Sequence, residues 1–580
     1  MRARLLILIL FTLLVEGCSS KPLFSSRPSP ADTIYFGGDI LTMAGRAPEY
    51  VEAIGVTNGI ITQLGKESAI QPYRGENTVV VDLDGKTLLP GFFDSHSHLA
   101  SVGMKLETVS LDPKPAGDIG DIGDIITQLK ARLINNPPSK GEWLLGMGYD
   151  NAMLAENRHP TKADLDKVST EVPIIIIHFS MHMAVLNSKA LALENIRATT
   201  PNPAGGAIHR VPNSTEPNGL IEETAMRGPL LKILKVLGDG IRYGNKTFIE
   251  RGLDIYSKNG FTTVIEAGAT PQQVIAFKQL AKEKRLNQDV IALQFFETAS
   301  VGDVKKEYST VYRNRFRVGG GKVVLDGGSP GRTAYLRMPY HTPTPGRGAD
   351  YRGYPTIKEQ SALNSLVDSY YRNDTPIFIH ALGDAAVDMS INAVKYAEAN
   401  IGAPFDKRTQ IIHAQQVQPD QFDLLKDLDI TITFQVAHNF YFSDYHRKYI
   451  YGPVRTDRLN PIKSAMYHGI SSTIHHDAPV HPVDQMMLMW AAVNRSSRSG
   501  VVSGEDQQIT PYQALQASTI NAAYQFFEEH KKGSLEAGKM ADFVILDRNP
   551  LRIERQEINE IRVLETIKSG ATIWNSDTSH

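Results

Sequence analysis

Three features are scarce in this sequence of 580 residues, and each scarcity excludes something. The chain has one cysteine, Cys18, so no disulfide can form within it. Its formal net charge is −2, so it offers no basic surface for nucleic acid, and we expect no nucleic-acid partner. The apolar run at residues 5–15 is too short for a membrane-spanning helix, which needs about 20 residues. The length instead allows one large domain with attachments.

The start of the chain has the pattern of an export signal. Two arginines precede the apolar run, and Cys18 follows it after a small glycine, which resembles a bacterial lipoprotein signal. The resemblance implies removal of residues 1–17 and attachment of lipid to Cys18, with residues 18–31, rich in serine and proline, as a tether. We expect an exported lipoprotein facing the periplasm, whose only membrane contact is this anchor. The alternative is an ordinary signal peptide and a soluble periplasmic or secreted protein.

Short apolar runs recur along the middle of the chain and predict buried strands. Helical patterns separate several of them, for example residues 384–400. Near-continuous apolar strands that alternate with helices are typical of a parallel sheet with both faces covered. Eight such runs predict an α/β fold, a (β/α)8 TIM-like barrel. The runs are residues 91–98, 260–268, 289–297, 321–328, 375–380, 408–415, 429–438 and 469–479.

The regions outside this pattern predict two further parts. Residues 32–88 and 533–580 both carry short β-like runs bounded by Gly, Asn or Asp, so the two chain ends can pair into one small composite β-sandwich domain. The barrel would span residues 89–532. The segment from about residue 105 to 250 is too long for a loop between the first two strands, and we interpret it as an inserted subdomain.

Polar residues stand where a barrel enzyme needs them. His96 and His98 are two positions apart, so in a strand both point the same way. His380, His413 and Asp477 each end a later predicted strand. Barrel enzymes carry their chemistry at the carboxyl ends of the strands, and neutral imidazole is the commonest metal ligand among side chains. The pattern predicts a metal cluster, although any one histidine alone is better explained as part of the core.

Four segments make a family resemblance specific. "LLPGFFDSHSH" resembles the first-strand signature of metal-dependent amidohydrolases, and "HALGDAAVD", "HAQQVQP" and "HDAPVHPVD" resemble the later motifs of the amidohydrolase 3 branch. That branch includes N-substituted formamide deformylases. "GSLEAGKMADFVILD" is similar to the C-terminal β-domain shared across the superfamily. The resemblance covers nearly the whole chain after residue 31, and it implies the fold predicted above.

The resemblance also implies a set of metal ligands. His96 and His98 would bind one divalent ion with Asp477, and His380 and His413 would bind a second ion or complete a mononuclear site. Zinc is expected, although iron, manganese or nickel suit the same ligands.

Lys322 matches the position at which two-metal members of the family carry a bridging carboxylated lysine, N6-carboxylysine. An ammonium has no lone pair, whereas a carbamate offers two anionic oxygens. The alternative is an ammonium paired with a carboxylate such as Asp326.

The implied reaction is hydrolysis of an amide-like C–N bond in a small molecule, with a metal-activated water as the nucleophile. Asp477 would act as the catalytic residue that accepts the water proton and passes it to the leaving nitrogen. N-substituted formamides or N-acyl compounds are the expected substrates. His182 matches a histidine position of the family in the insertion, and a packing role is the alternative for it. The candidate substrate-binding residues are His182, Asp326, Gln435, His438 and His476.

One departure from the family pattern and the alternative functions remain to be considered. His475 and His476 stand where the family commonly has a small residue and serine, and the extra imidazole can add a ligand, contact substrate or face the barrel wall. "GGSPG" matches a serine nucleophile motif, but Pro330 after Ser329 lacks the N–H that such a site needs, so we reject it. A deaminase or isomerase can use the same metal site, and a non-catalytic ligand-binding lipoprotein is the alternative of another class. The sequence leaves open whether the chain forms a homodimer.

Overall fold

The computed structural model describes residues 29–113, 117–139, 141–230, 242–243, 246–344, 346–401 and 406–577. The predicted signal peptide, Cys18 and most of the tether lie outside these residues. Within the described part of the chain, no helix combines the length and the hydropathy that a membrane span requires.

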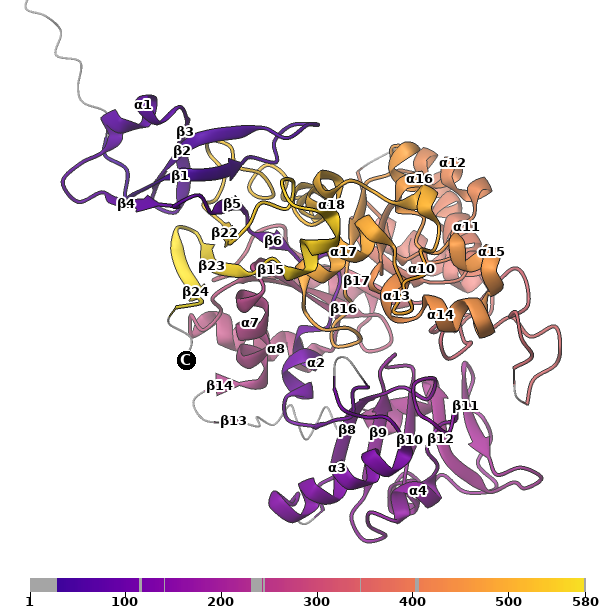
Figure 1. The fold of residues 1–580 in the computed structure, drawn as a ribbon. Coiled ribbons are helices and arrows are strands. Elements are labelled where there is room, and N and C mark those ends of the chain that lie inside the picture. The colour runs from indigo at the N-terminus through magenta and orange to yellow at the C-terminus, as the bar shows by residue number, and fades with distance from the viewer. Residues whose placement is uncertain are drawn as a thin grey trace, which may run out of the picture.

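An eight-stranded parallel sheet forms the centre of the molecule (Figure 1). Every neighbouring pair in it is parallel, and the strands follow one another in chain order. Each of the eight predicted runs overlaps one of these strands, so the predicted TIM-barrel-like fold is confirmed. The strands are β6 (Phe92–Phe93), β15 (Phe261–Ala269), β16 (Asp289–Phe295), β17 (Phe316–Val324), β18 (Ile377–Ala381), β19 (Gln410–His413), β20 (Thr431–Phe434) and β21 (Ser472–Ile474).

Hydrogen bonds join the first and last strands of this sheet. The Ser95 hydroxyl, just after β6, donates to the carbonyl of Ile474 in β21 at 2.9 Å. The backbone N–H of His98 donates to the carbonyl of Ala478 at 2.9 Å. The segments that carry the first and last predicted metal ligands are therefore held side by side.

Strand β17 begins at Phe316, five residues before the predicted run. The missed portion ends in Gly319 and Gly320, directly before Gly321, and glycine usually weakens a strand. Here the glycines allow close contact: a Cβ on Gly321 would lie 2.1 Å from the Tyr370 hydroxyl, and one on Gly320 would lie 2.4 Å from the Pro376 carbonyl. The neighbouring chain therefore packs directly against the backbone of the strand.

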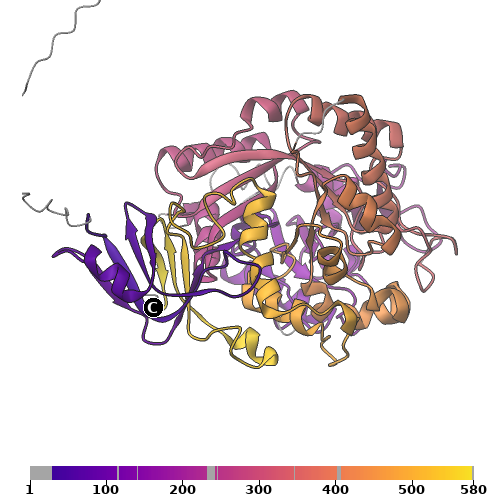
Figure 2. The same ribbon diagram turned by 90° about the horizontal axis from the view of Figure 1, so that it is seen from above.

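Helices surround the sheet, as the view from above shows (Figure 2). Several begin at a threonine whose side chain caps the first turn, with Thr270 and Thr510 each followed by proline. Their apolar faces and the strands share one large core. The longer helices here are α2 (Leu99–Lys105), α7 (Phe248–Lys258), α8 (Pro271–Lys282), α9 (Val301–Glu307), α10 (Gln360–Arg372), α11 (Asp384–Ile401), α12 (Pro419–Asp427), α17 (Gln485–Asn494) and α18 (Pro511–Ala517).

Strands from both chain ends share a second sheet, where the indigo and yellow segments meet in Figure 1. The antiparallel pairing of β22 with β5 joins them, with Phe543 opposite Pro90 and Leu546 opposite Thr87. The composite domain over residues 32–88 and 533–580, as a sandwich, stays a prediction. In order, the sheet contains β24 (Ala571–Asn575), β23 (Val563–Lys568), β22 (Phe543–Leu546), β5 (Thr87–Pro90), β1 (Thr33–Leu41), β2 (Tyr50–Thr57) and β3 (Ile60–Gly65), with β4 (Val79–Asp82) on β1.

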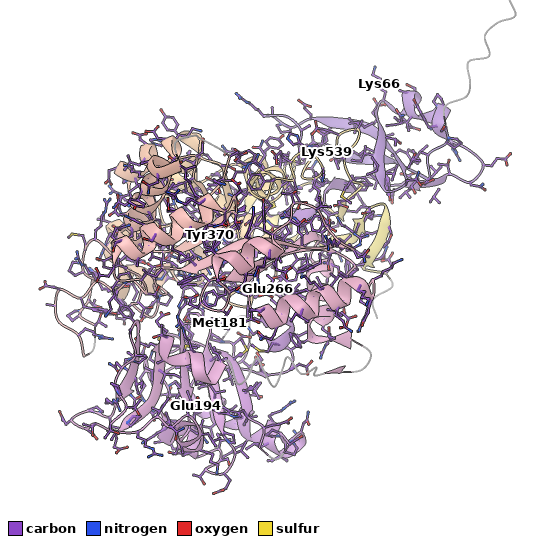
Figure 3. The ribbon with its side chains drawn as sticks, turned by 180° about the vertical axis from the view of Figure 1, so that it is seen from behind. Lys66, Met181, Glu194, Glu266, Tyr370 and Lys539 are labelled. Atoms are coloured by element: carbon purple, nitrogen blue, oxygen red, sulfur yellow. The ribbon has the colours of Figure 1, made fainter. Side chains whose placement is uncertain are left out.

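A six-stranded sheet lies between β6 and β15 in the chain and below the barrel in Figure 1. It has its own apolar clusters, packed with α3 (Ile122–Asn135), α4 (Lys162–Asp166) and α5 (Ser188–Leu193). Its order is β11 (Gly206–Arg210), β12 (Pro217–Glu223), β10 (Met183–Leu186), β9 (Ile174–His178), β8 (Leu144–Tyr149) and β7 (Val109–Ser110). The turn between β9 and β10 points to the barrel, as the Met181 label shows (Figure 3).

Candidate metal centre

The predicted metal ligands meet at the carboxyl ends of the barrel strands. Oδ1 of Asp477 lies 3.3 Å from Nε2 of His96 and 3.4 Å from Nε2 of His98. Oδ2 of Asp477 lies 4.0 Å from Nε2 of His413. One ligand atom from each of His96, His413 and Asp477 falls within 4.8 Å of the others, the spacing of a metal site.

The two remaining predicted ligands border this group. Nδ1 of His380 lies 3.1 Å from Nε2 of His413. Nζ of Lys322 lies 3.3 Å from Nε2 of His96, and the lysine is 2% exposed. The structure thus brings all six predicted residues into one contiguous cluster.

Burial sets the protonation of this cluster. It lowers the pKa of His96 to about 3 and holds the pKa of His380 and His413 well below the usual value. These rings are therefore neutral, the form that binds metals. Burial alone would raise the pKa of Asp477, but contacts with His96 and His98 outweigh it and hold that pKa well below its usual range. A carboxylate thus faces neutral imidazoles.

The backbone is strained at the same place. His413, Ala414 and Asp477 have φ values of 77°, 42° and 56°, in the left-handed region that non-glycine residues rarely adopt. Each such residue costs about 1–3 kcal/mol and persists where the surroundings fix it, most often at functional sites.

A chain of hydrogen bonds orients the ring of His413. Ser95 donates to the Ile474 carbonyl, which can only accept, so the Thr433 hydroxyl must donate to Ser95 at 2.9 Å. Nδ1–H of His475 then donates to Thr433 at 2.9 Å, and Nε2 of His475 accepts from Nδ1–H of His413 at 3.1 Å. This direction alone satisfies all four contacts. It leaves Nε2 of His413, which faces Asp477 and Nδ1 of His380, with a lone pair and no proton.

The donor set fits a divalent cation. Oδ1 of Asp477 and Nε2 of His380 are buried and have no hydrogen-bond partner among the described residues. Buried polar atoms normally have a partner, and both residues line one cavity together with His413. Imidazole nitrogens and a carboxylate oxygen are the ligands that zinc takes in catalytic sites.

The structure separates the substrate-binding candidates into two groups. His182, Gln435 and His438 line a small cavity beside His380, His413 and Asp477. Its volume of about 20 Å³ leaves room for about one water molecule. Gln435 also donates from Nε2 to Oδ2 of Asp477 at 3.2 Å.

Asp326 and His476 do not line that cavity. Asp326 accepts three backbone N–H groups, from Tyr335, Leu382 and Gly383, and its Oδ1 lies 3.6 Å from Nε2 of His380. Asp326 therefore supports loops and faces the predicted metal-binding side chain of His380, and it forms no ion pair with Lys322. The ring of His476 packs against Tyr256 and Phe261, so it faces the barrel wall.

Several residues outside the predicted set support the site. Asp94 accepts from the N–H groups of His96 and Ile265, which ties the ligand loop to β15. Glu266 lies within β15 and accepts from the N–H of Ala100 at 2.6 Å, and a carboxylate inside this apolar run was a usable signal. Figure 3 labels Glu266 within the barrel.

Glu223 pairs with Nδ1 of His182 at 2.9 Å, and no sequence pattern indicated this partner. Burial alone would lower the pKa of His182, but the Glu223 carboxylate outweighs it and raises that pKa. The charge of a protonated His182 is thus balanced within the protein.

A parallel barrel with imidazoles and a carboxylate clustered at its carboxyl end defines a hydrolase with a candidate metal-binding site. The family profile described as "Amidohydrolase family" matches residues 79–574. The chain therefore belongs to the amidohydrolase family, which confirms the resemblance found in the motifs, and it is a hydrolase that acts on C–N bonds.

Individual relatives are similar in sequence over nearly the whole length of this chain. The chain is 25% identical to N-substituted formamide deformylase of Arthrobacter pascens over 532 residues, 90% of this chain and 94% of that protein. It is 25% identical to the putative amidohydrolase YtcJ of Bacillus subtilis over 557 residues, 93% of this chain and 99% of that protein. Among solved structures, an uncharacterized metal-dependent hydrolase from Pyrococcus furiosus matches with a TM-score of 0.67 and 25% identity, covering 90% of this chain and 100% of that chain.

Proposed function

We propose that this hydrolase removes a small acyl group from the nitrogen of a neutral N-substituted amide, with N-substituted formamides as the first substrate class. The observation that carries the proposal is the shared carboxylate of Asp477, which faces His96, His98 and His413 within 4.0 Å. The cavity beside it is small, which suits a formyl group, and the relative from Arthrobacter pascens is named for such substrates.

In this proposal His96, His98, Asp477, His380 and His413 hold one or two divalent ions, with zinc as the first choice. A divalent ion held there lowers the pKa of a water molecule and polarises a carbonyl group. Burial keeps the His96 ring neutral, so it has one nitrogen lone pair, and the low pKa of Asp477 keeps its carboxylate ionised; both are the forms that a metal ion binds.

Asp477 moves the proton in this reaction. Its carboxylate lines the cavity and is ionised, because contacts with His96 and His98 hold its pKa well below the usual range, so it can accept a proton from water. Gln435 holds Oδ2 at 3.2 Å and fixes the orientation of the carboxylate. The Asp477 carboxyl group then returns the proton to the leaving nitrogen, as a general base that becomes a general acid.

We also propose that Lys322 is carboxylated when two ions bind. Three observations support this: the lysine is 2% exposed, it contacts His96, and no described carboxylate lies within ion-pair distance of it. A buried ammonium without a counter-ion is costly, whereas a carbamate supplies two anionic oxygens at the cluster.

The remaining structural proposals concern the surroundings of the site. Phe179, Ser180 and His182 belong to the six-stranded sheet region and line the cavity together with barrel residues, which supports a subdomain inserted over residues of about 105–250 that covers the barrel mouth. The sandwich of both chain ends, and export as a lipoprotein anchored at Cys18, are proposed from the sequence alone. Mass spectrometry of the mature N-terminus tests the anchor.

The first experiment is metal content per chain, measured on protein purified without added metal, for the wild type and Asp477→Ala. Asp423→Ala is the matched control, because that carboxylate is 83% exposed. About two ions, lost or reduced in Asp477→Ala only, support the binuclear site and a bridging Lys322. One ion supports a mononuclear site and removes the reason for carboxylation. No ion, even after titration, refutes the proposal.

The second experiment separates substrates. Formanilide and acetanilide test removal of a formyl or an acetyl group, and release of aniline is the readout. N-acetylleucine tests a substrate with a carboxylate, and ammonia release from adenine tests the deaminase alternative. Hydrolysis of the neutral anilides with little activity on the other two supports the proposal, whereas ammonia release alone favours a deaminase.

A further inference from the structure

A hydrogen-bonded group lies directly behind the cavity wall. The Ser329 hydroxyl contacts both Oε1 of Gln415 and the Tyr451 hydroxyl, and the Tyr451 oxygen lies 3.3 Å from the same Oε1. Nε2 of Gln415 lies 2.7 Å from Nδ1 of His438. All four side chains are buried, and they come from loops after β17, β19 and β20 and from the segment after residue 450.

Counting protons fixes the orientation of the Gln415 amide. With Oε1 toward the hydroxyls, both hydroxyl protons find acceptors, because Ser329 donates to the amide oxygen and Tyr451 donates to Ser329 or to the same oxygen. If the amide were reversed, its NH2 group would donate to the Ser329 oxygen. Ser329 would then donate to Tyr451, and the Tyr451 proton would have no acceptor. A buried proton without an acceptor is unfavourable, so the first orientation holds.

This orientation fixes the tautomer of His438. The amide nitrogen carries only protons, so Nδ1 of His438 accepts and the ring proton resides on Nε2. His438 lines the cavity with Asp477, and its Nε2 makes no hydrogen bond within the described part of the chain. The remaining polar atom of the ring is therefore an N–H that is free to meet a ligand.

We propose that His438 is a hydrogen-bond donor to the substrate carbonyl oxygen, and that Gln415, oriented by Ser329 and Tyr451, is the positioning residue that keeps the proton on Nε2. This inference rests on the proposed amide substrate, because a carbonyl oxygen is the acceptor. It assigns Ser329 a role other than nucleophile. Its neighbours Gly328 and Pro330 line the cavity, whereas its own hydroxyl is bonded to Gln415 behind the wall.

The donor acts on the oxygen as negative charge develops there. A fixed donor aimed at such an oxygen contributes about a hundredfold to a thousandfold to kcat. We therefore expect His438→Asn to lower kcat for formanilide by about that factor with KM nearly unchanged, because the shorter amide cannot reach the Nε2 position. His438→Gln places an amide N–H near that position, and we expect it to retain activity within about tenfold of the wild type.

A double-mutant cycle tests the role of Gln415. Gln415→Leu removes the bond to Nδ1, and we expect kcat to fall about tenfold to a hundredfold when residue 438 is histidine. In the His438→Gln background the same change has no tautomer to set, so we expect less than about a threefold loss. Gln416→Leu is the matched control, because the side chain of this neighbouring buried glutamine donates to the Arg455 carbonyl and not to His438. An equal loss from Gln415→Leu in both backgrounds would mean that Gln415 is merely structural, and it overturns the proposal.

Neutron diffraction from deuterium-exchanged wild-type crystals gives a readout that needs no activity and no variant. We expect a deuteron on Nε2 of His438 and none on Nδ1. A deuteron on Nδ1 overturns the proposal even if every variant fails to fold. If instead the metal-loaded wild type hydrolyses no anilide while the deuteron lies on Nε2, the proposed substrate class has failed and the tautomer assignment stands.

Discussion

Replacement of His475 by leucine tests how far the protein prepares His413 for a metal ion. In the wild type, Nε2 of His475 accepts from Nδ1–H of His413 at 3.1 Å, so the lone pair of His413 lies on Nε2. Without His475, that proton is better placed on Nε2, where His380 lies 3.1 Å away and can accept it. A cation must then displace the proton before His413 can bind it.

The structure sets the size of this effect. One buried hydrogen bond is lost, and a buried donor left without a partner costs about 1–3 kcal/mol. Since about 1.4 kcal/mol is tenfold in an equilibrium constant, the metal dissociation constant should rise between about fivefold and about 150-fold. Loss of a partner behind a metal-binding histidine typically weakens metal binding by about 10–100-fold, which lies within that range.

The assay is titration of metal-free protein with zinc in competition with a chromophoric chelator. His476→Asn is the matched control, because that neighbouring ring packs against Tyr256 and Phe261, and an asparagine oxygen can replace its Nδ1 as acceptor for the Ala478 N–H. His475→Gln, whose amide oxygen can accept a hydrogen bond, should recover part of the affinity. Equal zinc affinity in His475→Leu and the wild type would refute the reasoning, as would an equal loss in His476→Asn.

Three further predictions concern stability. Burial alone would raise the pKa of Asp164, but hydrogen bonds from Arg158 and the helix start lower it to about 2. Solvent screens the half-exposed Arg158, so the contribution of Asp164 is about 1 kcal/mol; it is present above the unfolded pKa and is lost as pH falls through about 2. The difference in unfolding free energy between Asp164→Asn and the wild type should therefore shrink by about half between pH 6 and pH 3. Lys568→Met should cost about 3–5 kcal/mol, because it leaves two buried carboxylates that lie 2.6 Å from Nζ without this partner, and an unchanged melting temperature would contradict this. Gly103→Ala should cost about 1–3 kcal/mol in denaturant unfolding, because its Cβ would lie 1.7 Å from the Phe248 carbonyl and force α2 away from α7.

The sequence predicted the parts of the site that depend on one strand at a time. Each barrel strand is a short apolar run, and the residue that ends it lies at the carboxyl edge, so the run pattern alone was enough to group His96, His380, His413 and Asp477. The same reasoning placed Lys322 within the fourth strand. It missed the start of β17 because Gly319 and Gly320 there pack against neighbouring residues, and no local pattern encodes that contact.

Roles that depend on contacts across strands could not be predicted. The extra imidazoles before Asp477 had three possible roles, and the structure gives them different ones: His475 holds His413, whereas His476 faces the wall. Asp326 has the residue type of a substrate ligand, yet three backbone N–H groups occupy it. Which partner a buried polar side chain finds is decided by the three-dimensional packing of distant segments.

The pairing of β5 with β22 has a consequence for synthesis of the chain. Thr87–Pro90 emerges from the ribosome early, but its partner Phe543–Leu546 follows only after the whole barrel has been made, a delay of tens of seconds at usual rates. During that time one edge of the young β5 has no neighbour, directly before the strand that carries His96. Completion of the second sheet, directly before the first barrel strand, is thus coupled to arrival of the last part of the polypeptide, and a chain that stops short leaves an open edge where aggregation begins.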